Sequence, residues 1–306
     1  PAPASPWPLT ENLARQDLPP GTFNVLLGGG GEVGEALIQS PLVDAISFTG
    51  SLAVGRRIAQ AAAANLTKFQ LEMGSKNPLV VLDDADMATA VQCAVVGGYS
   101  GTGQKCTASS RLIVHRKVLD AFTEALLARL KAMKVGHALA EGTEMGPVVS
   151  AAQLASNLNY IEQGQRQGAE LLWGGQALEL DHPGYYMSPA LFANGRNDMG
   201  INREEMFGPM ACIIPAADDD EALHMANDSE FGLTGGVVTR SLARATRFRR
   251  ALKTGCVMVN LPTAGTDYHV PFGGRGNSSF GSREQGRYAE EFYTQVKTAY
   301  IHPGEV

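Results

Sequence analysis

The sequence predicts an α/β fold built around a parallel sheet, and two observations lead to this class. From residue 23 onward, short apolar runs alternate with amphipathic helical stretches, often with glycines between them. A strand, a glycine turn, a helix and a second strand in succession are typical of right-handed βαβ units. The apolar runs are also hydrophobic almost throughout, as expected of strands buried on both faces of a parallel sheet.

The first part of the chain supplies the clearest βαβ pattern. The glycine-rich run 28–34 (GGGGEVG) separates an apolar run from a helical stretch, and SFTGS at 47–51 closes one strand and opens a helix. In order, the expected elements are strands at 23–27, 44–50 and 68–74 and helices at 34–40 and 51–66.

The second part continues the alternation and then changes character. The expected strands are at 77–84, 111–115, 184–194 and 210–218, and the expected helices are at 85–99, 117–136, 147–175 and 218–228. Residues 290–302 (EEFYTQVKTAYIH) instead alternate with β-branched and aromatic side chains. That pattern indicates an exposed or exchanged strand at the end of the chain.

Composition and charge exclude several functions. The 306 residues are 44% apolar and carry a formal net charge of −6, which suits one large or two medium domains. An acidic balance without a long Lys/Arg run argues against a nucleic-acid partner. The apolar runs are too short to span a membrane, and the N-terminal PAPASPWPL has no basic region before an apolar core, so we expect neither a membrane segment nor a signal peptide.

The cysteines and histidines indicate neither a metal site nor a disulfide framework. The four cysteines form no CxxC pair or Cys/His cluster, and the six histidines show no metal-ligand spacing. We therefore expect no metal and a reducing, cytoplasmic compartment. Cys93, Cys212 and Cys256 lie in apolar runs and are expected in the core.

Cys106 lies in different surroundings, within SGTGQKCTASSR at 100–111. Small residues on both sides leave its sulfur approachable, and Lys105 adds a cation beside it, which suits a nucleophile. A buried small hydrophobe and an inert surface thiol are the alternatives, and the Gly/Ser/Thr surroundings weaken the first of them.

Glu72 ends a predicted strand within QLEMGSKNP. In open α/β sheets the carboxyl ends of strands are where ligands bind, so this acid is either a base facing a cleft or a cap for the next segment. Asn77, before Pro78, is most simply a turn residue.

Two glycine segments are candidates for a dinucleotide. Gly50 and Ser51 stand where a strand gives way to a helix, and N–H groups at a helix start favour a pyrophosphate. The run from Gly28 to Gly34 has the same strand–turn–helix position but does not match GxGxxG strictly. Tight turns between strand and helix are the alternative for both segments.

Two further segments stand out. EEMFGPM at 204–210 combines two acids, Phe207 and a Gly-Pro turn, and an acidic loop with a packed Phe is its simplest interpretation. The Gly/Ser-rich stretch 270–286 contains Phe and Arg residues, which favour an ordered and functional loop over a disordered one.

Taken together, these segments resemble the aldehyde dehydrogenase superfamily in order and spacing. The matching segments are FTGS, LEMGSKNP, GQKCTASSR, EEMFGPM and PFGGRGNSSFGSREQG, and Cys106 follows Glu72 by 34 residues, the usual family separation. The motif carries Met73 and Ser75 where Leu and Gly are commoner, and we expect both to be tolerated. The resemblance runs from about residue 20 to the C-terminus.

The resemblance implies a role for each segment. Cys106 would attack an aldehyde and pass through a thiohemiacetal and a thioester, with its own N–H as one oxyanion donor. Glu72 would activate the water that hydrolyses the thioester, which favours the hydrolytic branch over the CoA-acylating branch. Glu205 would bind the nicotinamide ribose, Phe207 would pack near the ring, and Gly50 and Ser51 would meet the pyrophosphate.

The final part of the chain narrows the expected substrate. The stretch 264–286 and EFYTQVKTAY are similar to dehydrogenases of α-ketoglutarate semialdehyde (2,5-dioxopentanoate). A distal carboxylate on the substrate requires a cation, and Arg275 and Arg283 are the local candidates. Surface arginines that bind backbone carbonyls are an equal alternative.

The resemblance also implies a domain plan and a missing part. We expect the second half of a Rossmann-like dinucleotide-binding domain at 1–74, an α/β catalytic domain at 75–284 and an oligomerisation tail at 285–306, in a homo-oligomer (dimer or tetramer).

The family's N-terminal part would supply an adenosine-ribose lysine and an oxyanion asparagine that are not present here. The resemblance implies NAD or NADP as the cofactor. The alternatives for this chain are a silent fragment that serves only in assembly, and an esterase that needs no cofactor.

Overall fold

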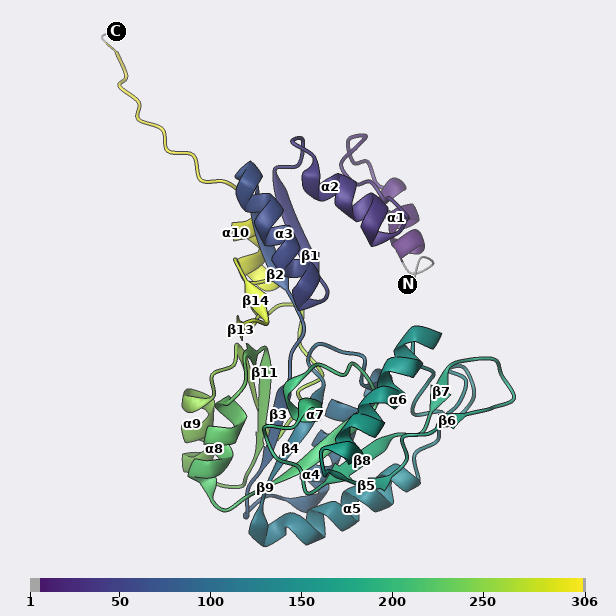
Figure 1. Cartoon of the computed structure of the whole chain (residues 1–306). Helices are drawn as coiled ribbons and strands as arrows, with labels where there is room; N and C mark the ends of the chain where they lie inside the picture. The colour runs from purple at the N-terminus through teal and green to yellow at the C-terminus, as the bar shows by residue number, and fades with distance from the viewer. Residues whose placement is uncertain (1–5, 305–306) are drawn as a thin grey trace. The chain divides into compact units, whose positions relative to one another are not determined.

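The computed structural model describes residues 6–304, which divide into two compact units (Figure 1). The smaller unit comprises residues 6–47 and 53–69, and the larger comprises residues 48–52 and 70–304. The larger unit thus includes residues 48–52 and 70–74, which lie within the domain that we predict at 1–74.

The smaller unit is mostly helical. Its elements are α1 (Pro6–Ala14), a π-helical turn at Gly30–Gly34, α2 (Glu35–Gln39), β1 (Ala45–Thr49), α3 (Leu52–Asn65) and the start of β2 (Lys68–Glu72). The strand predicted at 23–27 is wrong, because these residues form no strand in the structure. An apolar run becomes a strand only where a neighbouring strand takes its backbone hydrogen bonds, and none pairs with this run among the described residues.

A seven-stranded sheet organises the larger unit and confirms the predicted α/β class. In spatial order it comprises β12 (Cys256–Val259), β11 (Thr234–Val238), β3 (Asn77–Val81), β4 (Ser109–His115), β9 (Met210–Ala216), β8 (Ala190–Ala193) and β5 (Glu170–Trp173). Every neighbouring pair is parallel except β5 with β8. The central strands are buried on both faces, which explains their continuous apolar character.

Helices cover both faces of this sheet, and alternate strand residues contact different helices (Figure 1). Leu79 and Leu112 pack in one core with α4 (Met87–Gly98) and α5 (Leu119–Lys131). Their neighbours pack in the opposite core with α8 (Asp219–Asn227) and α9 (Leu242–Ala251). The period of two along each strand therefore divides the apolar residues between two cores.

Side-chain caps fix where several of these helices begin. Asp86, Ser150, Asp218 and Ser241 each accept a hydrogen bond from a backbone N–H in the first turn of α4, α6 (Ala151–Arg166), α8 and α9, respectively. Each cap satisfies a donor that the helix itself leaves without a partner.

Short elements complete the larger unit. They are α7 (Gly200–Arg203), the hairpin of β6 (Ala177–Leu178) and β7 (Tyr186–Met187), the pair β10 (Phe231–Gly232) and β13 (Arg275–Gly276), β14 (Ser279–Phe280) and α10 (Ala289–Tyr293). Part of the strand predicted at 290–302 is thus helical, and residues 294–304 are extended without belonging to a sheet. Among residues 6–304, no helix is long and apolar enough to cross a bilayer.

Candidate active site

A cavity of about 640 Å³ in the larger unit brings most of the predicted site residues together. Three of the loops that line it lead into adjacent parallel strands, β3, β4 and β9, and Thr266, Phe272 and Gln285 come from the segment after β12. The predicted site residues that line it are Gly50, Ser51, Glu72, Cys106, Glu205 and Phe207. Segments separated by more than 150 residues in the sequence therefore meet at one cavity.

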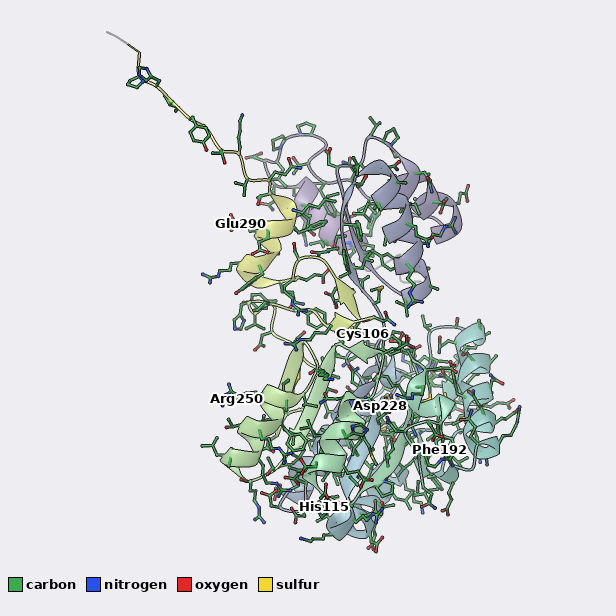
Figure 2. The ribbon with its side chains drawn as sticks, turned by 60° about the vertical axis from the view of Figure 1, so that its left-hand side comes forward. Cys106, His115, Phe192, Asp228, Arg250 and Glu290 are labelled. Atoms are coloured by element: carbon green, nitrogen blue, oxygen red, sulfur yellow. The ribbon has the colours of Figure 1, made fainter. Side chains whose placement is uncertain are left out.

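The cavity lies at the amino ends of these three strands. Cys106 precedes β4 and His115 ends it, and Figure 2 labels the two residues at opposite ends of the larger unit's sheet. From the sequence we expect ligands at the carboxyl ends of strands. Among the residues that line the cavity, Glu72 ends β2 and Gly50 follows the end of β1. The loops that enter the large sheet supply Cys106, Glu205 and Phe207.

The turn before Cys106 has an uncommon backbone conformation. Gly101, Thr102 and Gly103 all have φ between 61° and 65°, in the left-handed region that disfavours a β-branched residue such as Thr. The Thr102 hydroxyl donates to the carbonyl of Gly146 at 3.2 Å, which helps to hold the turn. A Cβ at Gly103 would lie 2.2 Å from the carbonyl oxygen of Gly208, so the two loops touch through their backbones.

Asn77 holds the loop that carries the nucleophile candidate. Its side-chain amide donates to the carbonyls of Cys106 at 2.8 Å and Ala108 at 2.9 Å, and its Oδ1 accepts the N–H of Thr234 at 3.0 Å. The residue is 1% exposed. Asn77 is therefore a buried clamp, and its interpretation as a simple turn residue was wrong; its place before Pro78 gave no signal of this role.

Cys106 is half-buried, and its surroundings favour the thiol over the thiolate. Burial is the main cause that raises the pKa of Cys106 to about 11, and the carboxyls of Glu205 and Glu72 add to it. The N–H groups of Cys106 itself and of Thr107 act in the opposite direction, so both face the sulfur. A thiol with this pKa needs a base or a nearby positive charge to become a nucleophile at neutral pH.

Glu72 has the properties of such a base. It is 4% exposed, and burial raises its pKa to about 7, with a smaller contribution from Glu284. A hydrogen bond from Ser279 and the charge of Arg283 lower it. A carboxyl group that titrates near neutrality is poised to take a proton and return it.

Glu205 is held by the backbone of the segment that follows Glu72. Its Oε1 accepts the N–H of Ser75 at 3.1 Å, and its carboxylate covers Gly74 so closely that a Cβ there would lie 1.9 Å from Oε2. Burial raises the pKa of Glu205. Phe207, at φ 52°, is 37% exposed and lines the same cavity, and Gln153 from α6 donates to its carbonyl.

The two glycine segments occupy different units. Gly50 donates its N–H to the carbonyl of Glu72 at 3.0 Å, which ties the start of α3 to the base candidate, and Ser51 follows it along the cavity wall. Gly28 and Gly34 belong to the smaller unit, in and beside the π-helical turn. A Cβ at Gly28 would lie 2.3 Å from the side chain of Val33, so local packing alone explains that glycine.

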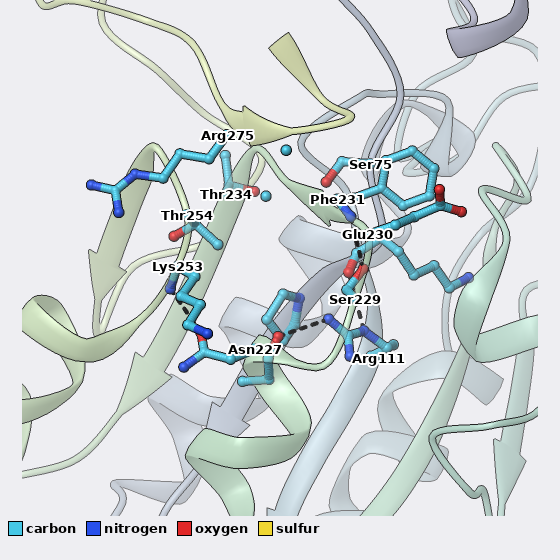
Figure 3. A pocket seen from close by; sticks show the side chains of 15 residues that line it. Ser75, Arg111, Asn227, Ser229, Glu230, Phe231, Thr234, Lys253, Thr254 and Arg275 are labelled. Carbon is cyan, nitrogen blue, oxygen red and sulfur yellow. Dashed lines mark hydrogen bonds between the residues drawn. The ribbon is translucent and has the colours of Figure 1, made fainter.

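The two candidate substrate arginines do not line this cavity. Arg275 is exposed and lines a second cavity of about 430 Å³, together with Lys253, Thr254 and Glu230 (Figure 3). Arg283 donates to the carbonyl of Gly274 at 2.7 Å, the backbone-binding alternative considered for it. Lys105, by contrast, lines the cavity beside Cys106.

The lining of the cavity offers groups that could contact the nicotinamide end of a dinucleotide. Glu205 offers a buried acceptor for ribose hydroxyls, and Phe207 offers an aromatic face. Gly74, which no side chain larger than hydrogen can replace without moving Glu205, keeps this acceptor against the wall. Within residues 6–304, no three His, Cys, Asp or Glu side chains are grouped to hold a metal ion.

Comparison with known proteins identifies the family of the chain. The sequence profile of the aldehyde dehydrogenase family matches residues 1–299. The chain is 44% identical to the α-ketoglutaric semialdehyde dehydrogenase of Bacillus subtilis over 288 residues, and 42% identical to the betaine aldehyde dehydrogenase of Rhizobium johnstonii over 299 residues. These alignments cover 94% and 97% of this chain, and 59% and 61% of those proteins.

Solved structures give the same result. HpcC from Thermus thermophilus superposes with a TM-score of 0.92 at 39% identity, over 98% of this chain and 59% of that one. Betaine aldehyde dehydrogenase from Staphylococcus aureus, in complex with NAD+, superposes with a TM-score of 0.89 at 36% identity, over 94% and 56% of the two chains. The chain thus spans about three fifths of the length of its relatives, and it belongs to the aldehyde dehydrogenase family.

Proposed function

We propose that the protein to which this chain belongs oxidises an aldehyde to a carboxylic acid with NAD or NADP. The observation that carries the proposal is the shared cavity, which is lined by a nucleophile candidate, Cys106, a base candidate, Glu72, and a ribose-binding candidate, Glu205. The cavity wall at Gly50 and Ser51, where α3 begins, is the proposed contact for the pyrophosphate.

The proposed chemistry begins with Cys106. Glu72 takes the thiol proton, directly or through water, and the sulfur attacks the aldehyde carbon to form a thiohemiacetal. The N–H groups that face the sulfur, those of Cys106 and Thr107, are placed to stabilise the oxyanion. A bound nicotinamide dinucleotide supplies the hydride acceptor that turns this adduct into a thioester, and its ring charge favours the thiolate.

Hydrolysis completes the proposed cycle. Glu72 removes a proton from water, the hydroxide adds to the thioester carbon, and Cys106 leaves as the thiolate. The buried carboxyl suits this step because its pKa of about 7 lets it accept a proton from water and release it at neutral pH.

We propose α-ketoglutarate semialdehyde as the substrate. The Bacillus subtilis relative carries that name, whereas other relatives of similar identity are named for betaine aldehyde. The two aldehydes differ in charge, since one bears a carboxylate and the other a quaternary ammonium group. Lys105, whose Nζ donates to the Ser100 hydroxyl at 3.2 Å, is the one Lys or Arg among the described residues that line the cavity, and it is the proposed contact for the distal carboxylate.

The test measures NAD(P)H formation with 2,5-dioxopentanoate and with betaine aldehyde, using NAD and NADP in turn. Cys106→Ala should lower turnover by at least about a thousandfold, and Glu72→Gln by about a hundredfold or more. Cys93→Ala, which changes a buried cysteine of α4, is the matched control. Unchanged turnover in the Cys106 variant would reject the proposal.

A further inference from the structure

Ser279 lies directly opposite Glu72, because β14 pairs with β2 in a register that joins these two residues. The Ser279 hydroxyl is 2.6 Å from Glu72 Oε2 and also 2.6 Å from the backbone nitrogen of Gly274. An N–H can only donate, so the hydroxyl oxygen accepts from Gly274. The hydroxyl proton is therefore directed to the carboxylate of Glu72.

The glycine pair beside Ser279 provides space for the other carboxylate oxygen. A Cβ at Gly273 would lie 2.9 Å from Glu72 Oε1 and 2.4 Å from the guanidinium of Arg283. Gly273 has φ 150°, in a region that side chains rarely adopt. Arg283 donates to the Gly274 carbonyl at 2.7 Å and so braces the same turn.

We propose that Ser279 is a positioning residue for the base: its hydroxyl, oriented by the Gly274 N–H, holds Glu72 at the end of β2 and stabilises its ionised form. This inference rests on the proposed role of Glu72 in the reaction. A buried carboxylate otherwise loses its charge to desolvation, and a neutral Glu72 cannot take a proton from the thiol or from water.

The charges around Glu72 support this assignment. Glu284 and Arg283, which follow β14, face it with opposite sign, and Cys106 faces it across the cavity. Among the causes that lower the pKa of Glu72, the Ser279 hydrogen bond is the largest and Arg283 is smaller. One hydroxyl therefore counteracts part of the effect of burial.

The test measures the titration of Glu72 itself, so that it is independent of catalysis. Carbon-detected NMR of protein labelled at the glutamate carboxyl carbon gives one titrating resonance that is absent from Glu72→Gln. In Ser279→Ala we expect the midpoint of this resonance to rise by about one to two pH units, the size of one hydrogen bond to a charged group. Ser279→Thr, which keeps the hydroxyl, should restore the parent midpoint.

Controls separate the hydroxyl from general effects. Ser282, three residues along, makes no side-chain hydrogen bond to any residue in 6–304, so Ser282→Ala should leave the midpoint unchanged. If Ser279→Ala does not fold, Ser279→Cys replaces the hydroxyl by a weaker donor and should shift the midpoint in the same direction. An unchanged midpoint in a folded Ser279→Ala or Ser279→Cys variant overturns the proposal.

A kinetic readout links the shift to function. In an active enzyme, the acid limb of the kcat/KM profile should move upward by the same number of pH units in Ser279→Ala, without a matching change in aldehyde KM. If the parent titrates as expected but does not oxidise aldehydes, the proposed function fails while the positioning of Glu72 stands. If the enzyme is active and neither the midpoint nor the acid limb moves, the positioning proposal fails alone.

Discussion

At the scale of single residues, the site depends on polar groups that are buried with specific partners. Glu72 and Glu205 both have raised pKa values because burial disfavours their charges, yet each keeps a hydrogen bond that offsets part of the effect. The negative charges of both carboxyls raise the pKa of Cys106. The cavity thus holds three groups whose protonation states depend on one another.

The raised pKa of Glu72 predicts how stability changes with pH. The folded state holds this proton more tightly than the unfolded state, so folding is favoured below about pH 4.5, and the advantage is lost as the pH rises to about 7. Relative to the parent, Glu72→Gln should gain up to roughly 3 kcal/mol of unfolding free energy between pH 4.5 and pH 8. Urea unfolding across this range measures it, with the exposed Glu179→Gln as control; a pH-independent difference would contradict the prediction.

We expect truncation of the Asn77 side chain to lower the free energy of unfolding strongly. Asn77→Ala removes three buried hydrogen bonds and leaves the carbonyls of Cys106 and Ala108 without this donor, so it should cost about 3 kcal/mol of unfolding free energy. Asn159→Ala, on the exposed face of α6, should cost nearly nothing. Urea midpoints of the two variants test the difference, and equal midpoints would show that the clamp is energetically unimportant.

At the scale of elements, the loop that carries Cys106 is shaped by close backbone contacts. Gly103 touches the Gly208 carbonyl, and Asn77 joins the loop to β3 and β11. A run of three left-handed residues ends three positions before Cys106. The strain of this turn is placed directly beside the proposed nucleophile, where such strain commonly accompanies function.

Two glycines with positive φ allow the cost of a left-handed backbone conformation to be measured separately from the cost of a steric contact. Gly168→Ala should cost about 1 kcal/mol, because its φ of 92° is unfavourable for Ala but nothing lies within 4 Å of the added Cβ. Gly103→Ala should cost at least about 3 kcal/mol, since its Cβ also meets the Gly208 carbonyl. Thermal unfolding compares the two, and similar losses would mean that the loop contact yields easily.

How far the sequence predicts these elements depends on where their hydrogen bonds go. The buried strands 77–81, 109–115 and 210–216 were predictable because continuous apolar runs have few alternatives. The run 23–27 is also largely apolar, but pairing decides whether it becomes a strand, and pairing is not visible in a local pattern. The role of Asn77 was hidden for the same reason, since its partner Thr234 lies 157 residues away.

At the scale of the whole molecule, the structure brings the motif residues of the larger unit together but does not do so for every candidate. Cys106, Glu72, Glu205 and Phe207 line one cavity. Arg275 lines another cavity. Motifs with an ordered spacing locate a site well, whereas a charge chosen for its proximity in sequence does not, because the direction of a side chain depends on the fold.

We predict that the extended segment 294–304 mediates self-association of the chain. Val296, Tyr300 and Ile301 are 99%, 96% and 87% exposed, and such apolar side chains on an extended backbone are suited to add a strand to a second copy of the chain. The double variant Val296→Asp with Ile301→Asp should convert a dimer or tetramer to a smaller species in light scattering after gel filtration. Lys297→Asp is the control for charge alone, and an unchanged mass in the double variant would contradict this role.

The bonds of Asn77 also have a consequence for the order in which the molecule folds. They connect positions 29, 31 and 157 residues apart, and the longest of them forms only once β11 has joined the sheet, so the full set of bonds around Asn77 is complete only then. Contacts of such sequence separation form slowly, because the intervening chain must first be closed into a loop. We therefore expect the thiol to reach its final surroundings late during folding, and the rate at which it becomes protected from alkylation after dilution from urea measures this.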